Sequence, residues 1–580
     1  MKRRVLYLFL IYIIASNGVN GQSVTQSKHN LSFSGLKTVK SAGNSEICIF
    51  CHTSHTSNPK APMWNQKISG TIYTLYDSST LDAKPGQPDG TSILCLSCHD
   101  GTIALGNTLT NSNSRLSLAV NKEQRGNLGT DLSDDHPISF VYDKDLTIED
   151  TRLKDPASLA KHVLDNNEKM QCTSCHDPHK DLEGNFLKIS NKFSNLCFSC
   201  HDTEYWGNSS HNTSTNTWNG ILPNPWKHIE EPYDDVSKNA CSNCHDVHNA
   251  SGNERLLKSE NEEDNCLDCH NGNLARTDIE SEFSKPYRHN IYAYTGIHDP
   301  MEYNLNSLAP VNGSSLASVN GSKHIECVDC HNAHASNNKD SEAPFVKGSN
   351  FGVNGITNNG SPINQVNYEY EICFKCHADN QMADLPNTDR YLGSLNTRID
   401  FDSNNISYHP VTAIGKNIRP RGLIEPYSEN SRIFCSSCHG SDGQNAPAGP
   451  HGSFYPRILK ANYNLDETPQ MGSNWPFQMV NEFALCFECH DVSAVTNIHT
   501  DMSGGHFMET IGCNACHDPH GYEGGTYSEN RYGINFDRNV IQPNPLNGKM
   551  IDLDQKKCFM SCHDSGGVVN YTHSQRGDAY

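Results

Sequence analysis

The chain has 580 residues, of which only 35% are hydrophobic, and its mean hydropathy is −0.64. This composition excludes several large apolar cores, so the chain is either disordered or organised by something other than its own side chains. The formal net charge of −21 argues against nucleic acid as a partner, because phosphate backbones are bound by basic surfaces. The 24 cysteines and 30 histidines favour a chain organised around cofactors or metals.

Residues 1–21 predict a secretory signal peptide. A basic start, Lys2 to Arg4, precedes an apolar run over residues 5–15, which is too short to cross about 30 Å of hydrocarbon. A buried N-terminal helix is the alternative. The mature chain would begin near Gln22, with no later segment apolar enough to span a membrane. We therefore expect an exported protein of the periplasm, the cell surface or the extracellular space.

One motif of cysteine and histidine recurs along the rest of the chain. Eleven copies have two residues between the cysteines and a histidine directly after the second cysteine, and a twelfth copy has three residues between them. The paired cysteines are Cys48 and Cys51, Cys95 and Cys98, Cys172 and Cys175, Cys197 and Cys200, Cys241 and Cys244, Cys266 and Cys269, Cys327 and Cys330, Cys373 and Cys376, Cys435 and Cys438, Cys486 and Cys489, Cys513 and Cys516, and Cys558 and Cys562. The histidines that follow are His52, His99, His176, His201, His245, His270, His331, His377, His439, His490, His517 and His563.

The C-x-x-C-H pattern is the attachment signature of c-type haem. Two thiols add to the two vinyl groups of one porphyrin, and the histidine lies under the ring and ligates iron. Disulfides or zinc ribbons would use the cysteines without explaining the histidines. A thioredoxin-like motif would occur once, near a βαβ pattern. We therefore expect twelve covalent haem c groups.

The twelfth motif, at Cys558 and Cys562, is the least regular. Its extra residue can be absorbed as a bulge between the two thioethers, and His563 is retained. A disulfide or a haem with a single thioether is the alternative, and His573 lies nearby as a candidate ligand.

Histidine is also the predicted sixth ligand of the irons. The 30 histidines exceed the twelve motifs, whereas the 11 methionines are too few to serve every iron. Two histidines on each iron give six-coordinate, low-potential centres suited to electron transfer.

One group of candidate sixth ligands lies downstream of the motifs. A histidine three residues after the motif histidine lies on the same side of that haem, so it should ligate a neighbouring iron. These downstream histidines are His55, His179, His248, His334 and His520, with His451 in the corresponding place after an insertion. A surface or structural role is the alternative.

A second group lies upstream of alternate motifs, and solvated loop histidines are the alternative reading. These upstream histidines are His29, His136, His228, His409 and His506. For the remaining unit, His289 and His324 are favoured over His298. The surplus histidines are His162, His211, His499 and His573.

The cysteine spacing reveals an internal repeat. Paired motifs are either 25 or between 45 and 51 residues apart, and a phrase such as "FLKIS", "RLLKS", "PFVKG" or "RILKA" recurs between them. The repeat predicts six two-haem units at residues 22–125, 126–222, 223–285, 286–400, 401–500 and 501–580. Short helices should carry the motifs, and the connections rich in Asn, Ser, Gly and Pro should be loops.

The chain resembles the multihaem c-type cytochromes with doubled CxxCH motifs, through its motifs and through "ICIFCHTSH", "LCLSCHDGTIALG" and "HIECVDCHNAH". Members of this family are exported electron carriers, common in bacteria that respire metals or other external acceptors. The resemblance implies a mostly irregular fold with short α-helices, wrapped around a continuous chain of bis-histidine haems. Some members polymerise into conductive filaments.

The leading hypothesis is an electron carrier in periplasmic or extracellular electron transfer, with redox proteins or external electron acceptors as partners. A multihaem reductase of a small oxyanion is the alternative. Many such reductases replace the motif histidine of the open site by lysine, and no CxxCK occurs here. A conducting filament subunit, a homopolymer, is the third hypothesis.

Overall fold

The structure of the protein is a computed structural model. It describes residues 22–36, 39–55, 61, 63–110, 120, 124–252, 254–292, 325–379, 388–393, 396–417, 422–466, 475–500, 512–543, 551–552, 557–558 and 560–562. The predicted signal peptide lies outside these residues, as do the candidate ligands His298, His324, His506, His563 and His573.

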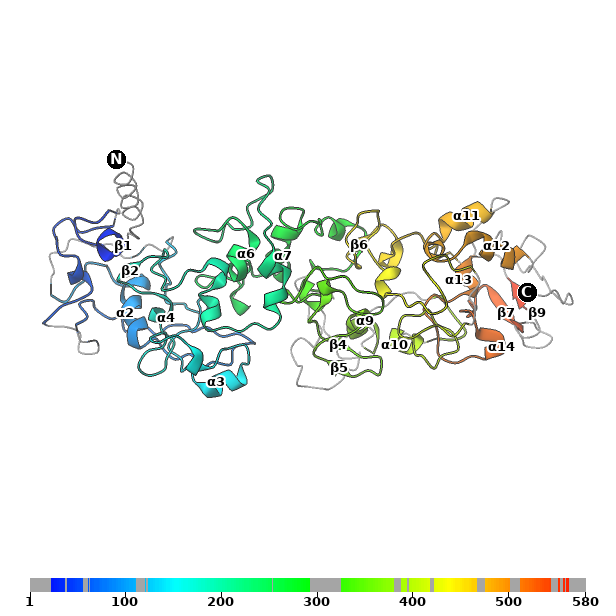
Figure 1. Ribbon diagram of the computed structural model, residues 1–580, viewed down its shortest axis with the longest axis horizontal. Helices are drawn as coiled ribbons and strands as arrows, with labels where there is room; N and C mark the ends of the chain where they lie inside the picture. The colour runs from blue at the N-terminus through cyan, green and yellow to red at the C-terminus, as the bar shows by residue number, and fades with distance from the viewer. Residues whose placement is uncertain are drawn as a thin grey trace, which may run out of the picture. The chain divides into compact units, whose positions relative to one another are not determined.

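Short helices and strands alternate with long irregular stretches throughout the described chain (Figure 1). The α-helices are α2 (Gly90–His99), α3 (Lys144–Glu149), α4 (Cys172–Cys175), α5 (Ser210–Thr213), α6 (Val236–Asn239), α7 (Glu262–His270), α9 (Glu369–His377), α10 (Thr397–Asp400), α11 (Trp475–Glu482), α12 (Val492–Thr500), α13 (Cys513–Cys516) and α14 (Tyr527–Asn530). The 3-10 helices include Cys48–Phe50, Cys197–Ser199, Ala240–Asn243, Cys327–Asp329, Cys435–Ser437 and Cys486–Glu488. The prediction of a mostly irregular fold with short helices is confirmed.

The sheets of the described residues are small antiparallel pairs. The strands are β1 (Gln22–Ser23), β2 (Lys180–Asp181), β3 (Tyr287–Arg288), β4 (Gly355–Ile356), β5 (Pro362–Ile363), β6 (Gly452–Ser453), β7 (Ile541–Pro543), β8 (Ile551–Asp552), β9 (Lys557–Cys558) and β10 (Met560–Cys562). They pair as β1 with β2, β3 with β6, β4 with β5, β7 with β10, and β8 with β9. Two of these pairs, β1 with β2 and β3 with β6, join segments far apart in sequence, so they fix long-range contacts rather than form a core.

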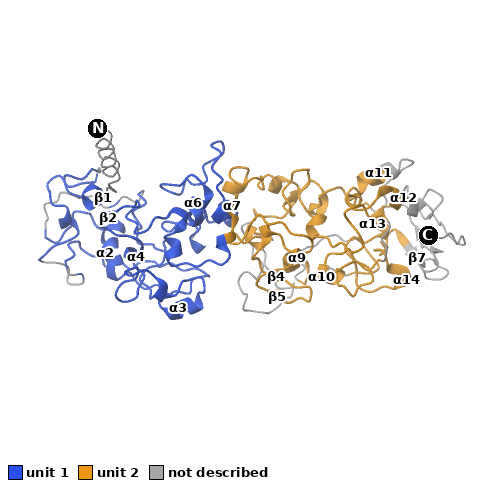
Figure 2. Ribbon diagram, viewed as in Figure 1, with its two compact units in different colours: residues 1–207, 211–265 blue, residues 208–210, 266–580 orange. Residues whose placement is uncertain are grey.

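The chain divides into two compact units (Figure 2). Unit 1 comprises residues 1–207 and 211–265, and unit 2 comprises residues 208–210 and 266–580. The finer division into six two-haem units stays a prediction.

Buried apolar side chains form several small clusters, which agrees with the low hydrophobic content. One cluster in unit 1 contains Phe140, Tyr142, Leu146, Val163, Met170 and Cys200. One in unit 2 contains Tyr370, Phe374, Ala378, Phe401, Tyr408 and Val411, with Cys435 packed against it. Cys200 is therefore part of an apolar cluster, whereas the other cysteines of the first eleven motifs are half-buried, apart from Cys48, which is exposed. No helix among the described residues has the length and apolar character needed to cross a membrane.

Candidate metal centres

The first eleven motifs all lie on helical turns, as expected. Three of them end α2, α7 and α9. In the others, the backbone N–H of the motif histidine donates to the carbonyl of the first cysteine at 2.8–3.1 Å, which closes one helical turn. This turn places both thiols and the imidazole in a fixed relation. The histidines held this way are His52, His176, His201, His245, His331, His439, His490 and His517.

The twelfth motif differs from this expectation. Cys558 lies in β9 and Cys562 in β10, so extended backbone replaces the helical turn. Cys558 pairs with Ile551, and Cys562 pairs with Ile541. The extra residue breaks the spacing that closes a single turn, and strand pairing takes its place. The prediction that short helices carry the motifs is therefore wrong at this motif.

A backbone carbonyl at or beside the phrase that recurs between paired motifs contacts the ring of the motif histidine. At four motifs, the residue that offers this carbonyl has a positive φ, and its oxygen lies 2.8–3.1 Å from the histidine Nδ1. The pairs are His176 with Asn185, His245 with Arg255, His439 with Arg457 and His517 with Tyr532. Tyr532 lies in "RYGINF", whose side chains differ from those of the recurring phrase although its backbone makes the same contact. His331 Nδ1 contacts the carbonyl of Ser349 at 2.9 Å in the same way.

This contact decides which nitrogen is free to bind a metal. A carbonyl oxygen only accepts, so Nδ1 carries the proton and donates it, and Nε2 keeps its lone pair for iron. This role of the phrase depends on backbone conformation, so it has no direct signature in the residue types.

Seven motif histidines each face a second imidazole at a centroid separation of 6.0–6.3 Å. In unit 1 these ring pairs are His52 with His179, His99 with His29, His176 with His248, and His201 with His136. In unit 2 they are His331 with His451, His377 with His289, and His439 with His520. In every pair, the second ring is a candidate sixth ligand from the sequence.

The separation suits one metal ion held between two rings. With a metal–nitrogen bond of about 2 Å and a ring radius of roughly 1 Å on each side, two imidazoles that share a metal have centroids about 6 Å apart. Direct ring stacking without a metal is closer, as between His29 and Phe186 at 4.2 Å. The described residues therefore fit the haem irons that the motifs predict.

The ring pairs follow one rule along the chain. Four downstream histidines, namely His179, His248, His451 and His520, face the first motif histidine of the preceding predicted unit. Three upstream candidates, namely His29, His136 and His289, face the second motif histidine of their own predicted unit. The charge of His409 adds to burial in lowering the pKa of His490 to about 4, which indicates that these two residues are neighbours as well.

Other candidates lie outside these pairs. His55 is exposed, and no imidazole contacts it within the described residues. The Nε2 of His228 lies 2.7 Å from the carbonyl of Ser242. His334 is exposed, and the surplus His162 is exposed as well. The surplus His211 and His499 lie in α5 and α12.

Most ligand candidates are held in the neutral form that binds metals. Burial, together with the charge of the facing ring, lowers the pKa of His136 and of His520 to about 4. Burial is the largest influence on the pKa of His248 and acts to lower it, but the hydrogen bond that Nδ1 donates to Asp135 and the charges of Asp135 and its acidic neighbours together outweigh burial, so the net shift is upward. His248 is thus a ligand candidate whose ring hydrogen-bonds a carboxylate.

The cysteines of the first eleven motifs form no disulfides with one another. First cysteines interact between motifs of successive predicted units, namely Cys95 with Cys172, Cys197 with Cys241, and Cys373 with Cys435. Second cysteines influence one another between the two motifs of one predicted unit, namely Cys51 with Cys98, Cys175 with Cys200, and Cys438 with Cys489. The attachment sites of these consecutive motifs therefore lie near one another.

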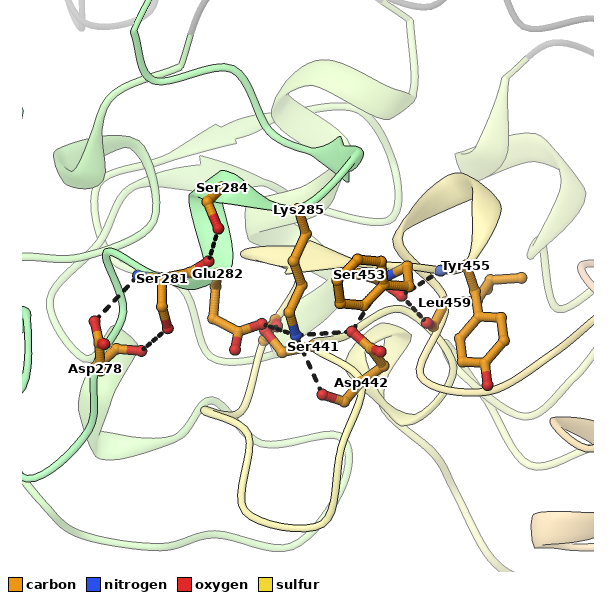
Figure 3. A network of polar contacts seen from close by, with 12 residues as sticks. Asp278, Ser281, Glu282, Ser284, Lys285, Ser441, Asp442, Ser453, Tyr455 and Leu459 are labelled. Atoms are coloured by element: carbon orange, nitrogen blue, oxygen red, sulfur yellow. Dashed lines mark hydrogen bonds and ion pairs between the residues drawn. The ribbon is translucent and has the colours of Figure 1, made fainter.

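A buried ion-pair network positions two of the candidate ligands in unit 2 (Figure 3). Lys285 Nζ lies 2.6 Å from a carboxylate oxygen of Glu282 and 2.8 Å from one of Asp442. Next to it, β3 pairs with β6, and His289 Nδ1 contacts the carbonyl of Pro450 at 2.8 Å. The network therefore fastens the segment that carries His289 to the loop that carries His451.

Comparison with known families gives two matches. A family model described as "Doubled CXXCH motif" matches residues 165–204 and 234–275, and one described as "Cytochrome c554 and c-prime" matches residues 434–518. A search of curated proteins found no significant match. The matched stretches contain seven of the motifs described above, and both families indicate covalent haem c and electron transfer. The chain is a multihaem c-type cytochrome.

Proposed function

We propose that this cytochrome is an exported dodecahaem electron carrier with two histidines on each iron. The observation that carries the proposal is the set of seven ring pairs at 6.0–6.3 Å, each joining a motif histidine to a candidate sixth ligand. An iron with both axial positions filled has no open site for a substrate, and this favours electron transfer over catalysis.

The protein's own residues would do three things at each centre. The motif cysteines would hold the haem by thioethers, the two imidazoles would fill both axial positions, and the carbonyl behind the motif histidine would fix its tautomer. The haem supplies a one-electron couple between ferrous and ferric iron. Because both axial ligands stay in place, a change of oxidation state requires little rearrangement.

The contacts between thiols support a single series of haems. Within each compact unit, the attachment sites of successive motifs adjoin, through first cysteines and second cysteines in turn. We propose six two-haem units; within each compact unit, downstream histidines such as His179 and His451 would ligate an iron of the preceding two-haem unit. Electrons would then pass along the protein in the order of its motifs.

Location and partners rest on the sequence. The apolar run after Lys2 to Arg4 supports export, and the negative net charge of −21 suits soluble redox partners of opposite charge. Redox proteins or external electron acceptors are the proposed partners.

Electron paramagnetic resonance of the purified ferric protein tests the proposal. A carrier gives low-spin signals that account for all of the iron. A high-spin signal from a five-coordinate centre, together with turnover of nitrite or hydroxylamine, would instead establish the reductase alternative.

One observation favours a filament as a second candidate function. His55 is the downstream histidine of the first motif, yet it is exposed and contacts no imidazole among the described residues. A candidate ligand that faces no motif histidine among the described residues could serve an iron of a neighbouring copy. Electron microscopy of the purified protein and of a His55→Ala variant tests this: ordered polymers that the variant loses support a filament, and dispersed particles for both oppose it.

A further inference from the structure

A buried carboxylate contacts one of the candidate iron ligands. Asp135 Oδ1 lies 3.0 Å from His248 Nδ1, and the Asp135 side chain is only 5% exposed. The same oxygen accepts the backbone N–H of Asn249 at 3.2 Å. His248 in turn faces the motif histidine His176, with 6.3 Å between ring centroids.

The backbone holds this contact in place from two segments that are far apart in sequence. The N–H of His136 donates to the carbonyl of Val247 at 3.0 Å, and the N–H of Ala250 donates to the carbonyl of Asp134 at 2.9 Å. Residues 134–136 are thereby fixed beside residues 247–250. The contact is part of the fold and does not depend on a loose surface side chain.

The other ligand candidates have different neighbours at Nδ1. Backbone carbonyls occupy this place at His99, His136, His176, His289, His331 and His439. At His179 the nearest carboxylate oxygen, from Asp177, lies 3.7 Å away, beyond hydrogen-bond distance. The buried Nδ1 of His451 has no partner among the described residues.

An anionic acceptor changes the electronic character of the imidazole. A carboxylate draws the Nδ1 proton more strongly than a neutral carbonyl does, so Nε2 becomes a stronger donor to iron. Stronger donation stabilises ferric over ferrous iron. Within the described residues, no lysine or arginine forms an ion pair with Asp135, so its charge is not neutralised by a salt bridge. In addition, burial reduces screening by salt.

We propose that Asp135 lowers the reduction potential of the iron shared by His176 and His248 below that of irons whose ligands bond to carbonyls. The inference rests on bis-histidine ligation, which is part of the proposed function. With this lower potential, an electron would need more free energy to reach the haem of the third motif than to reach haems whose ligands bond to carbonyls. The adjoining centre of His136 and His201 is an internal comparison, because His136 Nδ1 contacts the carbonyl of Pro137 at 3.0 Å.

Spectroelectrochemical titration of the intact haem-loaded protein and of Asp135→Asn tests the proposal. Asparagine keeps an acceptor oxygen at the same place and removes its charge, as at the centres bonded to carbonyls. We expect the lowest-potential component to become about tenfold easier to reduce, a rise of about 59 mV for one electron. One low-spin resonance signal should shift in the same variant.

Two further variants separate charge from structure. Asp135→Glu keeps the charge, so its lowest component should stay close to that of the unmodified protein. Asp177→Asn removes a carboxylate that accepts the backbone N–H of His179 at 3.0 Å but lies 3.7 Å from its Nδ1, beyond hydrogen-bond distance. Because asparagine keeps an acceptor oxygen for that backbone N–H, this variant should leave the titration unchanged. The proposal is overturned if Asp135→Asn titrates like the parent, or if Asp135→Glu shifts as much as Asp135→Asn.

Failure of this inference differs from failure of the proposed function. In the first case, the protein is wholly low-spin and only the effect of Asp135 is missing. In the second, the unmodified protein already shows a high-spin centre.

Discussion

The imidazole rings of His331 and His451 lie nearly parallel, with 8° between their planes and 6.2 Å between their centroids. The two residues belong to different predicted two-haem units. No local pattern brings them together: His451 sits on a loop that Lys285 and the β3–β6 pair fasten to an earlier segment. Because this centre is assembled from two predicted units, a change that disturbs the fold between them should also disturb metal ligation.

Replacing His451 by alanine should convert one centre from low-spin to high-spin and leave the others unchanged. The variant removes the ring that faces His331, and alanine cannot bind iron. Resonance Raman and electron paramagnetic resonance spectra of the ferric protein measure the change. His162→Ala is the matched control, because His162 is exposed and faces no motif histidine. A wholly low-spin spectrum for His451→Ala would assign the sixth ligand of His331 elsewhere.

Replacing Lys285 by methionine should destabilise the protein by about 3–5 kcal/mol, since it leaves two buried carboxylates without their cation. The carboxylates belong to Glu282, 8% exposed, and Asp442, 16% exposed. The denaturation midpoint of the haem-loaded protein measures the loss. Lys144→Met is the control, because its ion pair with Asp155 is exposed and should contribute no more than about 1 kcal/mol. Equal midpoints for the two variants would contradict a structural role for the network.

Gly452 should not tolerate a side chain. A Cβ at this position would clash with the carbonyl oxygen of Glu282, so the backbone of β6 would have to move. We expect Gly452→Ala to cost about 1–3 kcal/mol and to weaken ligation by the adjacent His451. Gly70→Ala serves as the control, because no atom lies within 4 Å of its Cβ. Unchanged midpoint and spectra for Gly452→Ala would show that this strand pair does not position the ligand.

The twelfth motif should still bind haem. Intact mass spectrometry should give twelve haem additions, and the double variant Cys558→Ala, Cys562→Ala should give eleven. Both cysteines and the following His563 are retained, and the extra residue can be absorbed as a bulge between the two thioethers. A parent mass with eleven haems would mean that the extra residue prevents attachment.

The sequence alone predicts the attachment sites because thioether chemistry depends on local spacing. It also predicts which histidines are available as sixth ligands, since the downstream ones follow a motif histidine by three residues or after an insertion, and the upstream ones precede alternate motifs. It cannot predict which ring faces which, as the contact of His248 with Asp135 depends on two segments about a hundred residues apart. The role of "RYGINF" is hidden from the sequence because it lies in the carbonyl and positive φ of Tyr532, which different side chains can provide. The expectation that short helices carry the motifs fails at the twelfth motif, where the backbone is extended.

An iron-edge anomalous difference map from crystals of the haem-loaded protein tests the central claim most directly. If two histidines bind each iron, we expect an iron peak between the two rings of each of the seven pairs, with an imidazole nitrogen bound on both sides. Irons bound by the motif histidine alone, with water on the opposite face and the second histidine turned away, would contradict it.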